Sequence, residues 1–191
     1  MGGNYLIDAL QFLVQTLFGL YIAVVMARFL LAQVRADFNN PLSQFVVKAT
    51  QPLLRPMRRV IPPMGRVDSS SLVLMLLLQV TELVIFYLLR GQLPAVPGLL
   101  LAGVGELVNL ALNFYLVLLL VMVVSSWIGG GGYSPVLMLV DQLCAPLLRP
   151  LRKNIPPIGP LDASVLVAFL LLQLAKILLV APLMDAARSL M

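Results

Sequence analysis

Residues 52–68 decide the fold of this chain: Pro52-Leu-Leu-Arg-Pro-Met-Arg-Arg-Val-Ile-Pro-Pro-Met-Gly-Arg-Val-Asp68. The stretch recurs 94 residues later as Pro146-Leu-Leu-Arg-Pro-Leu-Arg-Lys-Asn-Ile-Pro-Pro-Ile-Gly-Pro-Leu-Asp162. We name these two copies the first and the second basic block. Both are rich in proline, and both stand between long apolar runs. The repeat predicts two tandem units, residues 1–94 and 95–191.

The composition places the chain in a membrane. Hydrophobic residues make up 61% of the 191 residues and charged residues only 11%. Soluble domains have roughly 45–50% apolar and ~25% charged residues, so a water-facing surface could hardly be covered here. Runs of about 20 mostly apolar residues are typical of membrane-spanning helices. We therefore expect an all-α integral membrane protein.

The formal net charge of +5 does not point to nucleic acid, because the basic residues lie next to the apolar runs and not on a separate domain. The chain has no histidine and one cysteine, which excludes an internal disulfide, histidine-based catalytic triads and the usual Cys/His zinc sites. We expect no cofactor, no metal and no enzymatic activity.

The apolar runs predict four spans, at about residues 5–31, 69–89, 105–128 and 162–183, with residues 90–104 as the loop between the two repeats. Asn40-Pro41 and Ser134-Pro135 are typical helix starts. Each predicts an amphipathic helix in the membrane interface between the two spans of its repeat. Pro52 should kink or restart the first of these helices.

Each basic block ends in a predicted turn and a helix cap. Asp68 and Asp162 are expected to cap the second and fourth spans. The turns are expected at the prolines and glycines of the blocks, namely Pro62, Pro63, Gly65, Pro156, Pro157 and Gly159.

The distribution of basic residues predicts the orientation. Nine of them flank the first and third connections, whereas only Arg90 and Arg188 lie near span ends on the opposite side. Under the positive-inside rule the basic connections are cytoplasmic and both termini lie outside. Two spans per repeat return the chain to its starting side, so the repeats should be parallel and related by an axis along the membrane normal.

Two intramembrane charges, Glu82 and Lys176, occupy equivalent positions of the repeat. Each costs at least ~2.5–3.5 kcal/mol in the bilayer and needs a partner or water. Three interpretations are open: an ion pair within the chain or across an oligomer interface, an ion or proton pathway, or separate snorkelling. Glu106, Asn109 and Asn113 follow one face of the third span.

The cations of the basic blocks are candidate binding residues for anionic lipid head groups or a protein partner. They are Arg55, Arg58, Arg59, Arg149, Arg152 and Lys153. One interpretation is topology determination with head-group contact, at about 1 kcal/mol per basic residue. The other is a docking surface, because the prolines restrict the backbone that presents the arginines.

The repeated P-L-L-R-P-[ML]-R-[RK]-x-I-P-P-[MI]-G-x-[VL]-D pattern, with Ser126-Trp127 at the end of the third span, resembles the YggT family of bacterial membrane proteins in its double-repeat form. The resemblance implies the inner (cytoplasmic) membrane and an association with osmotic stress tolerance and ion homeostasis, but no defined reaction. The resulting hypothesis is a scaffold or assembly and homeostasis factor, possible as a homo-oligomer. The alternative is an oligomeric ion channel or transporter component that uses the intramembrane polar residues.

Overall fold

The fold contains four long apolar helical rods. The computed structural model describes residues 5–62, 67–128, 134–155 and 162–191. The rods are α1 (Tyr5–Gln33), α3 (Ser69–Leu89), α4 (Val96–Ile128) and a last one built from α6 (Ala163–Ala175), the π-helical turn η1 (Lys176–Val180) and α7 (Ala181–Ser189). Two shorter helices, α2 (Pro41–Val60) and α5 (Pro135–Asn154), connect the members of each pair.

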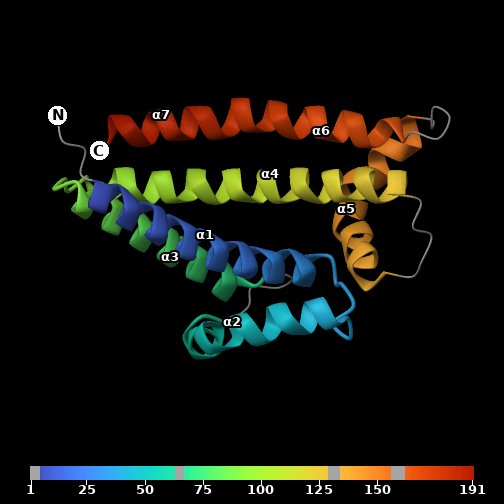
Figure 1. Ribbon diagram of the computed structural model, residues 1–191, viewed down its shortest axis with the longest axis horizontal. Helices are drawn as coiled ribbons and strands as arrows, with labels where there is room; N and C mark the ends of the chain where they lie inside the picture. Colours follow the sequence, from blue (N-terminus) through green and yellow to red (C-terminus); the bar gives the residue numbers. More distant parts are fainter. Residues whose placement is uncertain (1–4, 63–66, 129–133, 156–161) are drawn as a thin grey trace.

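The rods pack as two pairs that contact each other (Figure 1). α1 packs along α3, α4 packs along α6 and α7, and α3 joins the pairs by packing against α4. α2 lies against α1 and α3, and α5 lies against α4 and α6. The start of α1 and the end of α7 lie at the same end of the molecule, as an even number of crossings requires.

The outer surfaces of the rods are apolar. Leu13, Leu17 and Leu20 of α1 are each more than half exposed, whereas Ile22, Val25 and Met26 are buried between the helices. All four rods are long and apolar enough to cross a membrane. Exposed leucines in this number would be a liability in water, but they are the normal surface of a helix in lipid. The chain is a multi-pass membrane protein.

The amphipathic helix α2 has three sides. Ser43, Val46, Thr50 and Leu54 are buried against the rods. A second side is apolar and open, with Phe45 61% exposed next to the buried Val46. A third side is polar, with Gln44, Lys48, Gln51 and Arg55 exposed. α2 therefore uses one side to pack on its own spans and keeps an apolar side for lipid.

Of the two outcomes expected at Pro52, a kink or a restart, the restart does not occur, because one helix runs from Pro41 to Val60 through Pro52 and Pro56. Each proline removes one hydrogen bond to the carbonyl four residues earlier. Those carbonyls belong to Lys48 and Pro52, which are both exposed. Water or head groups can therefore satisfy them without breaking the helix.

The loop between the repeats is shorter than the sequence predicted. Residues 96–104 were expected to be irregular, but α4 already begins at Val96. Pro97 stands in the first turn, where a missing N–H costs nothing. Gly91 adopts a φ of +69°, which a glycine tolerates, and turns the chain after Arg90.

The last rod contains a π-helical turn that begins at Lys176. Pro182 follows within the first turn of α7 and cannot donate to the carbonyl of Leu178. The hydrogen-bond pattern of the helix shifts by one residue instead, and the N–H of Ala181 donates to the carbonyl of Lys176, five residues earlier. Turns of this kind are rare and often mark functional positions.

Candidate basic sites at the ends of α2 and α5

Each amphipathic helix ends in cations. Arg58 and Arg59 occupy the last turn of α2, and Arg152 and Lys153 occupy the last turn of α5. Positive charge is favourable there because the helix dipole leaves partial negative charge on the final carbonyls. Both helices then end in an extended residue, Ile61 or Ile155, which directs the chain toward the next span.

The same ion pair joins the helix end to the next span in both repeats. Arg58 pairs with Asp68, and Arg152 Nε lies 2.8 Å from Asp162 Oδ2. Both aspartates cap the following helix: Asp68 accepts from Ser71, and Asp162 accepts from the backbone N–H of Ser164. Each aspartate therefore fixes an arginine and a helix start together.

The electrostatics of Asp68 fit this double role. Burial by itself raises the pKa of the Asp68 carboxyl. Hydrogen bonds from Arg58 and Ser71, with the attraction of Arg58, outweigh burial and hold the pKa below its ordinary value of 3.8. Asp68 is therefore ionised, and its pair with Arg58 is intact, at physiological pH.

Two further cations of each block are exposed. Arg55 and Arg59 stand one helical turn apart on α2, and Arg149 and Lys153 stand one turn apart on α5. Among the described residues none of these four forms an ion pair within the chain. Each repeat thus has one arginine held by an aspartate and two cations open to a ligand.

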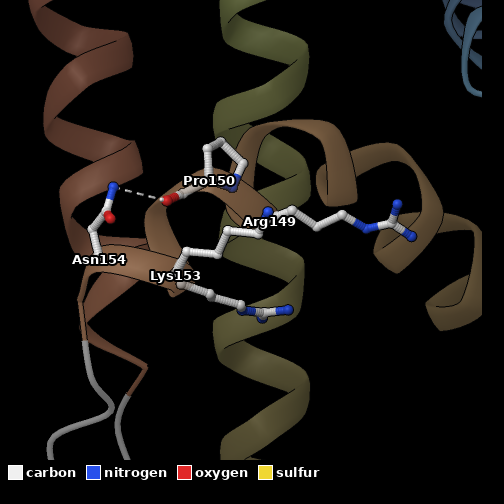
Figure 2. Close-up of a pocket in the computed structure, with 5 residues that line it drawn as sticks. Arg149, Pro150, Lys153 and Asn154 are labelled. Atoms are coloured by element: carbon white, nitrogen blue, oxygen red, sulfur yellow. Dashed lines mark hydrogen bonds between the residues drawn. The ribbon is translucent and has the colours of Figure 1, made fainter.

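The second block borders a shallow cavity of about 560 Å³. Figure 2 shows Arg149 and Lys153 at this site, with the amide of Asn154 turned toward the carbonyl of Pro150. Asn154 Nδ2 donates to Pro150 O at 3.3 Å, so the end of α5 is tied to itself. The described lining contains Arg149, Arg152 and Lys153 and no acidic residue, which suits an anionic ligand.

Part of the predicted turns can be placed. The carbonyl of Pro62 accepts a hydrogen bond of 2.7 Å from Ser69 Oγ, which braces the end of α2 against the start of α3. The other predicted turn residues lie outside the described residues, namely Pro63, Gly65, Pro156, Pro157 and Gly159.

The two basic ends are separate sites. α2 and α5 meet near their N-termini, where Asn40 Nδ2 donates to Pro135 O at 2.6 Å and Gln142 Oε1 accepts from the N–H of Asp37. From there the two helices run apart, and their C-terminal ends lie far from each other (Figure 1). A ligand bridging both ends must be extended, or two ligands must bind.

The intramembrane charges each have their own neutral partner. Lys176 Nζ donates to Asn113 Oδ1 at 2.8 Å, and Gln79 Nε2 donates to Glu82 Oε2 at 3.0 Å. Glu82 and Lys176 form no ion pair within the part of the chain that the structure describes. The within-chain pair suggested from their equivalent positions is therefore not formed, because Asn113 of α4 holds the lysine. A pair between two copies of the chain stays a prediction.

A line of polar side chains follows α4. Asn113 Nδ2 donates to Asn109 Oδ1 at 3.3 Å, and Asn109 Nδ2 donates to Glu106 Oε2 at 3.4 Å. With the bond from Lys176, four residues form one chain of hydrogen bonds. The polar chain thus joins α4 to the last rod inside the apolar region.

Sequence reasoning missed the place of Arg28. An arginine near the end of a span usually extends its stem to the head groups, but the Arg28 side chain is only 7% exposed and packs under α2. Arg28 Nη1 donates to Val47 O at 3.0 Å and to Thr50 Oγ1 at 2.7 Å. No local pattern shows this contact, because it depends on how α2 folds back over α1.

The family assignment follows from the comparison with known proteins. The sequence model of the CCB3/YggT family matches twice, at residues 7–89 and 101–183. The chain belongs to the CCB3/YggT family. The two matches are offset by the same 94 residues as the basic blocks, so each repeat is a family unit in itself.

Several bacterial relatives cover most of the chain. It is 43% identical over 173 residues to an uncharacterised protein of Pseudomonas aeruginosa. This match covers 88% of this chain and 87% of the relative. It is 40% identical over 167 residues to the uncharacterised protein YggT of Escherichia coli K12, with 86% of each chain covered. No solved structure was found to match. These relatives establish the family and the paired repeats, and they assign no activity.

Proposed function

We propose that this protein is a scaffold or assembly factor of the bacterial cytoplasmic membrane, which presents a basic surface at the end of each amphipathic helix to an acidic partner segment. Both basic ends would face the cytoplasm, and both termini would lie outside. The observation that carries the proposal is the ion pair that occurs in both repeats, Arg58 with Asp68 and Arg152 with Asp162.

Topology determination alone needs positive charge but no fixed geometry. Here one arginine of each block is held by the cap of the next span, which orders the last turn of the helix. The open cations then stand at i and i+4, where like charges destabilise a helix by about 0.2–0.5 kcal/mol. The helix dipole favours Arg59 and Lys153 in the last turn but not Arg55 and Arg149 one turn earlier, so helix stability explains only half of the arrangement. A carboxylate-rich partner would relieve the repulsion and bind both cations of each helix.

Arginine-to-lysine exchange tests the proposal, since it keeps the charge and removes bidentate pairing. A deletion strain carrying the triple variant Arg55→Lys, Arg59→Lys, Arg149→Lys is compared with wild type for growth under osmotic stress, the condition that the family resemblance suggests. We expect growth to fail while membrane insertion and protein level stay normal. Full growth of the triple variant would indicate that the blocks serve only to set the topology.

The matched control exchanges the two arginines at the other end of the molecule. Arg90→Lys and Arg188→Lys make the same substitution at positions outside the blocks. Arg188 pairs with Asp185, which lies three residues earlier in the same helix. These variants should grow like wild type. If they fail as the block variant does, the defect comes from a general loss of arginine and not from docking.

The polar chain along α4 favours a second candidate, an oligomeric ion or proton conduit. It links Glu106, Asn109, Asn113 and Lys176 within the apolar region, where such groups commonly line a pathway. Purified protein in liposomes should then pass protons or cations, and Lys176→Met should abolish the flux. Absence of flux from wild-type protein would leave the scaffold as the function.

A further inference from the structure

We propose that the cavity between α1 and α2 binds the phosphate group of an anionic phospholipid through Arg28, Lys48 and Arg58. The cavity has a volume of about 530 Å³ and borders all three cations, with the amides of Gln44 and Gln51 and the ring of Phe38 completing the polar and apolar lining. Among the residues that the structure describes, no acidic side chain lines it. The proposed docking function does not require this site.

The buried guanidinium of Arg28 is the group that would bind the anion. It is 93% removed from solvent, given its 7% exposure, yet its described hydrogen-bond partners are the neutral Val47 carbonyl and Thr50 hydroxyl. Both bonds use Nη1, whereas a guanidinium has five N–H donors. Among the described residues no salt bridge involves Arg28, and a buried charge without a direct ion-pair partner is costly. Arg28 lines the cavity, where an anionic oxygen would satisfy its remaining donors.

Thr50 fixes the direction of the guanidinium. Its hydroxyl donates to Val46 O at 2.7 Å and is thereby oriented to accept from Arg28 Nη1. Arg58 on the opposite wall is held by Asp68. Lys48 is exposed and flexible, and it can close on a ligand. Two fixed arginines and one mobile lysine make a site that is largely formed before the ligand arrives.

The position of the cavity selects a lipid as the source of the phosphate. α2 exposes an apolar side at Leu42, Phe45 and Leu53, which belongs at the level of the acyl chains. The cavity lies between this helix and a membrane span, so its ligand comes from the head-group layer. The cations bordering the cavity carry three positive charges, one of which Asp68 offsets, leaving an excess that matches a phosphodiester or phosphomonoester.

The second repeat lacks this site. The residues equivalent to Arg28 and Lys48 are Met122 and Gln142, although Arg58 has its counterpart in Arg152. The two repeats therefore agree in the ion pair of the block and differ in the cavity. This difference supplies test variants that the fold accommodates in the other repeat, Arg28→Met and Lys48→Gln.

The experiment compares nanodiscs of phosphatidylcholine alone with nanodiscs that also contain phosphatidylglycerol. Wild-type protein should gain thermal stability from the anionic lipid, because a ligand that binds the folded state stabilises it. Lys48→Gln should weaken this dependence by roughly tenfold in lipid concentration, the effect of one charge-assisted hydrogen bond. Arg28→Met should abolish it. Because this variant also loses the bonds to Val47 and Thr50, its gain from anionic lipid is measured relative to its own stability in phosphatidylcholine.

Lys153→Gln is the control, since it removes an equal charge from the other block. It should leave the lipid dependence as in wild type. An equal effect of Lys48→Gln and Lys153→Gln would show general surface attraction and overturn the site. Equal stabilisation by inorganic phosphate in phosphatidylcholine nanodiscs would overturn the lipid as its source. Both results are independent of the growth test for docking, because Lys48→Gln leaves Arg55, Arg59 and Arg149 in place.

Discussion

At the scale of single residues, Cys144 shows how burial lowers the reactivity of a thiol. The side chain is fully buried in the cluster formed with Leu119, Leu148 and Ala168. Burial, reinforced by the nearby charge of Asp141, raises the pKa of the Cys144 thiol from 9.0 to about 11. The thiolate is the reactive form, so this cysteine should be inert at neutral pH.

The raised pKa of Cys144 predicts a pH dependence of stability. A thiol whose pKa is higher in the folded state stabilises the fold fully below its unfolded pKa, and this contribution is lost as pH rises toward about 11. Between these values unfolding should become easier by about 1.4 kcal/mol per pH unit. The melting temperature of wild type should therefore fall relative to that of Cys144→Ala between pH 9.0 and about 11, and the difference between the two should be constant on either side of this window. Parallel curves would contradict the prediction.

Lys176 and Asn113 should be energetically coupled. Asn113→Leu leaves the ammonium group of Lys176 without the acceptor that lies 2.8 Å away. Lys176→Met removes the charge that needs the acceptor. The double variant should therefore be more stable than the two single changes add up to, with a coupling of about 0.5–3 kcal/mol. Thermal melting in detergent measures the stability of the four proteins in this double-mutant cycle. Additive effects would show that water already hydrogen-bonds the ammonium group of Lys176.

At the scale of helices, small residues decide how closely α4 approaches its neighbours. A Cβ on Gly98 would lie 3.0 Å from the Ala187 carbonyl oxygen and 3.0 Å from the Leu190 backbone. Gly19 of α1 meets nothing within 4 Å. Helices in a bilayer pack through such small residues because no hydrophobic force drives them together.

The two glycines make a matched pair of variants. Gly98→Ala should destabilise the contact of α4 with α7 by about 1–3 kcal/mol, since backbone atoms must move. Gly19→Ala should be neutral or stabilise by up to about 1 kcal/mol, because alanine is the better helix former. Detergent-resistance melting compares them. Equal stability of the two variants would mean that α7 shifts freely along α4.

Helix boundaries were predictable where a cap chemistry marks them. The span at residues 69–89 matches α3, because Asp68 supplies the cap and Gly91 supplies the turn. The start of α4 was missed because Pro97 and Gly98 suggest a loop, although proline is tolerated in the first turn.

Contacts across the chain were harder to predict than helices. The cations of the blocks were predictable from the repeat, and so were their capping aspartates. The burial of Arg28 depends on the packing of α2 over α1, and the bond from Lys176 to Asn113 depends on how α4 faces the last rod. Sequence periodicity describes one helix at a time and holds no information on such pairings.

At the scale of the whole molecule, the two repeats share a frame and differ in detail. Both have a span, an amphipathic helix, an ion pair and a second span. Only the first has Arg28 beneath its amphipathic helix, and only the second has a π-helical turn in its last rod. Common elements of this kind maintain the fold, and the differences are where each repeat can carry a separate role.

Orientation is a property of the whole molecule, and the charge distribution predicts it. The basic ends of α2 and α5 should face the cytoplasm, so the connection between α3 and α4 should lie outside. Gln92 is exposed in that connection, and Arg59 is exposed at the end of α2. Gly98 would be a poor probe because it is buried against the end of α7.

Cysteine labelling with a membrane-impermeant maleimide decides the orientation. Native Cys144 should give no background, since it is buried and its raised pKa keeps the thiol protonated at neutral pH. Gln92→Cys should be labelled in intact spheroplasts, whereas Arg59→Cys should be labelled only after the membrane is opened. The reverse pattern would invert the topology and place the basic ends outside. Such an inversion would remove the cytoplasmic partner from the scaffold proposal, but it would leave the phosphate cavity in contact with a head-group layer.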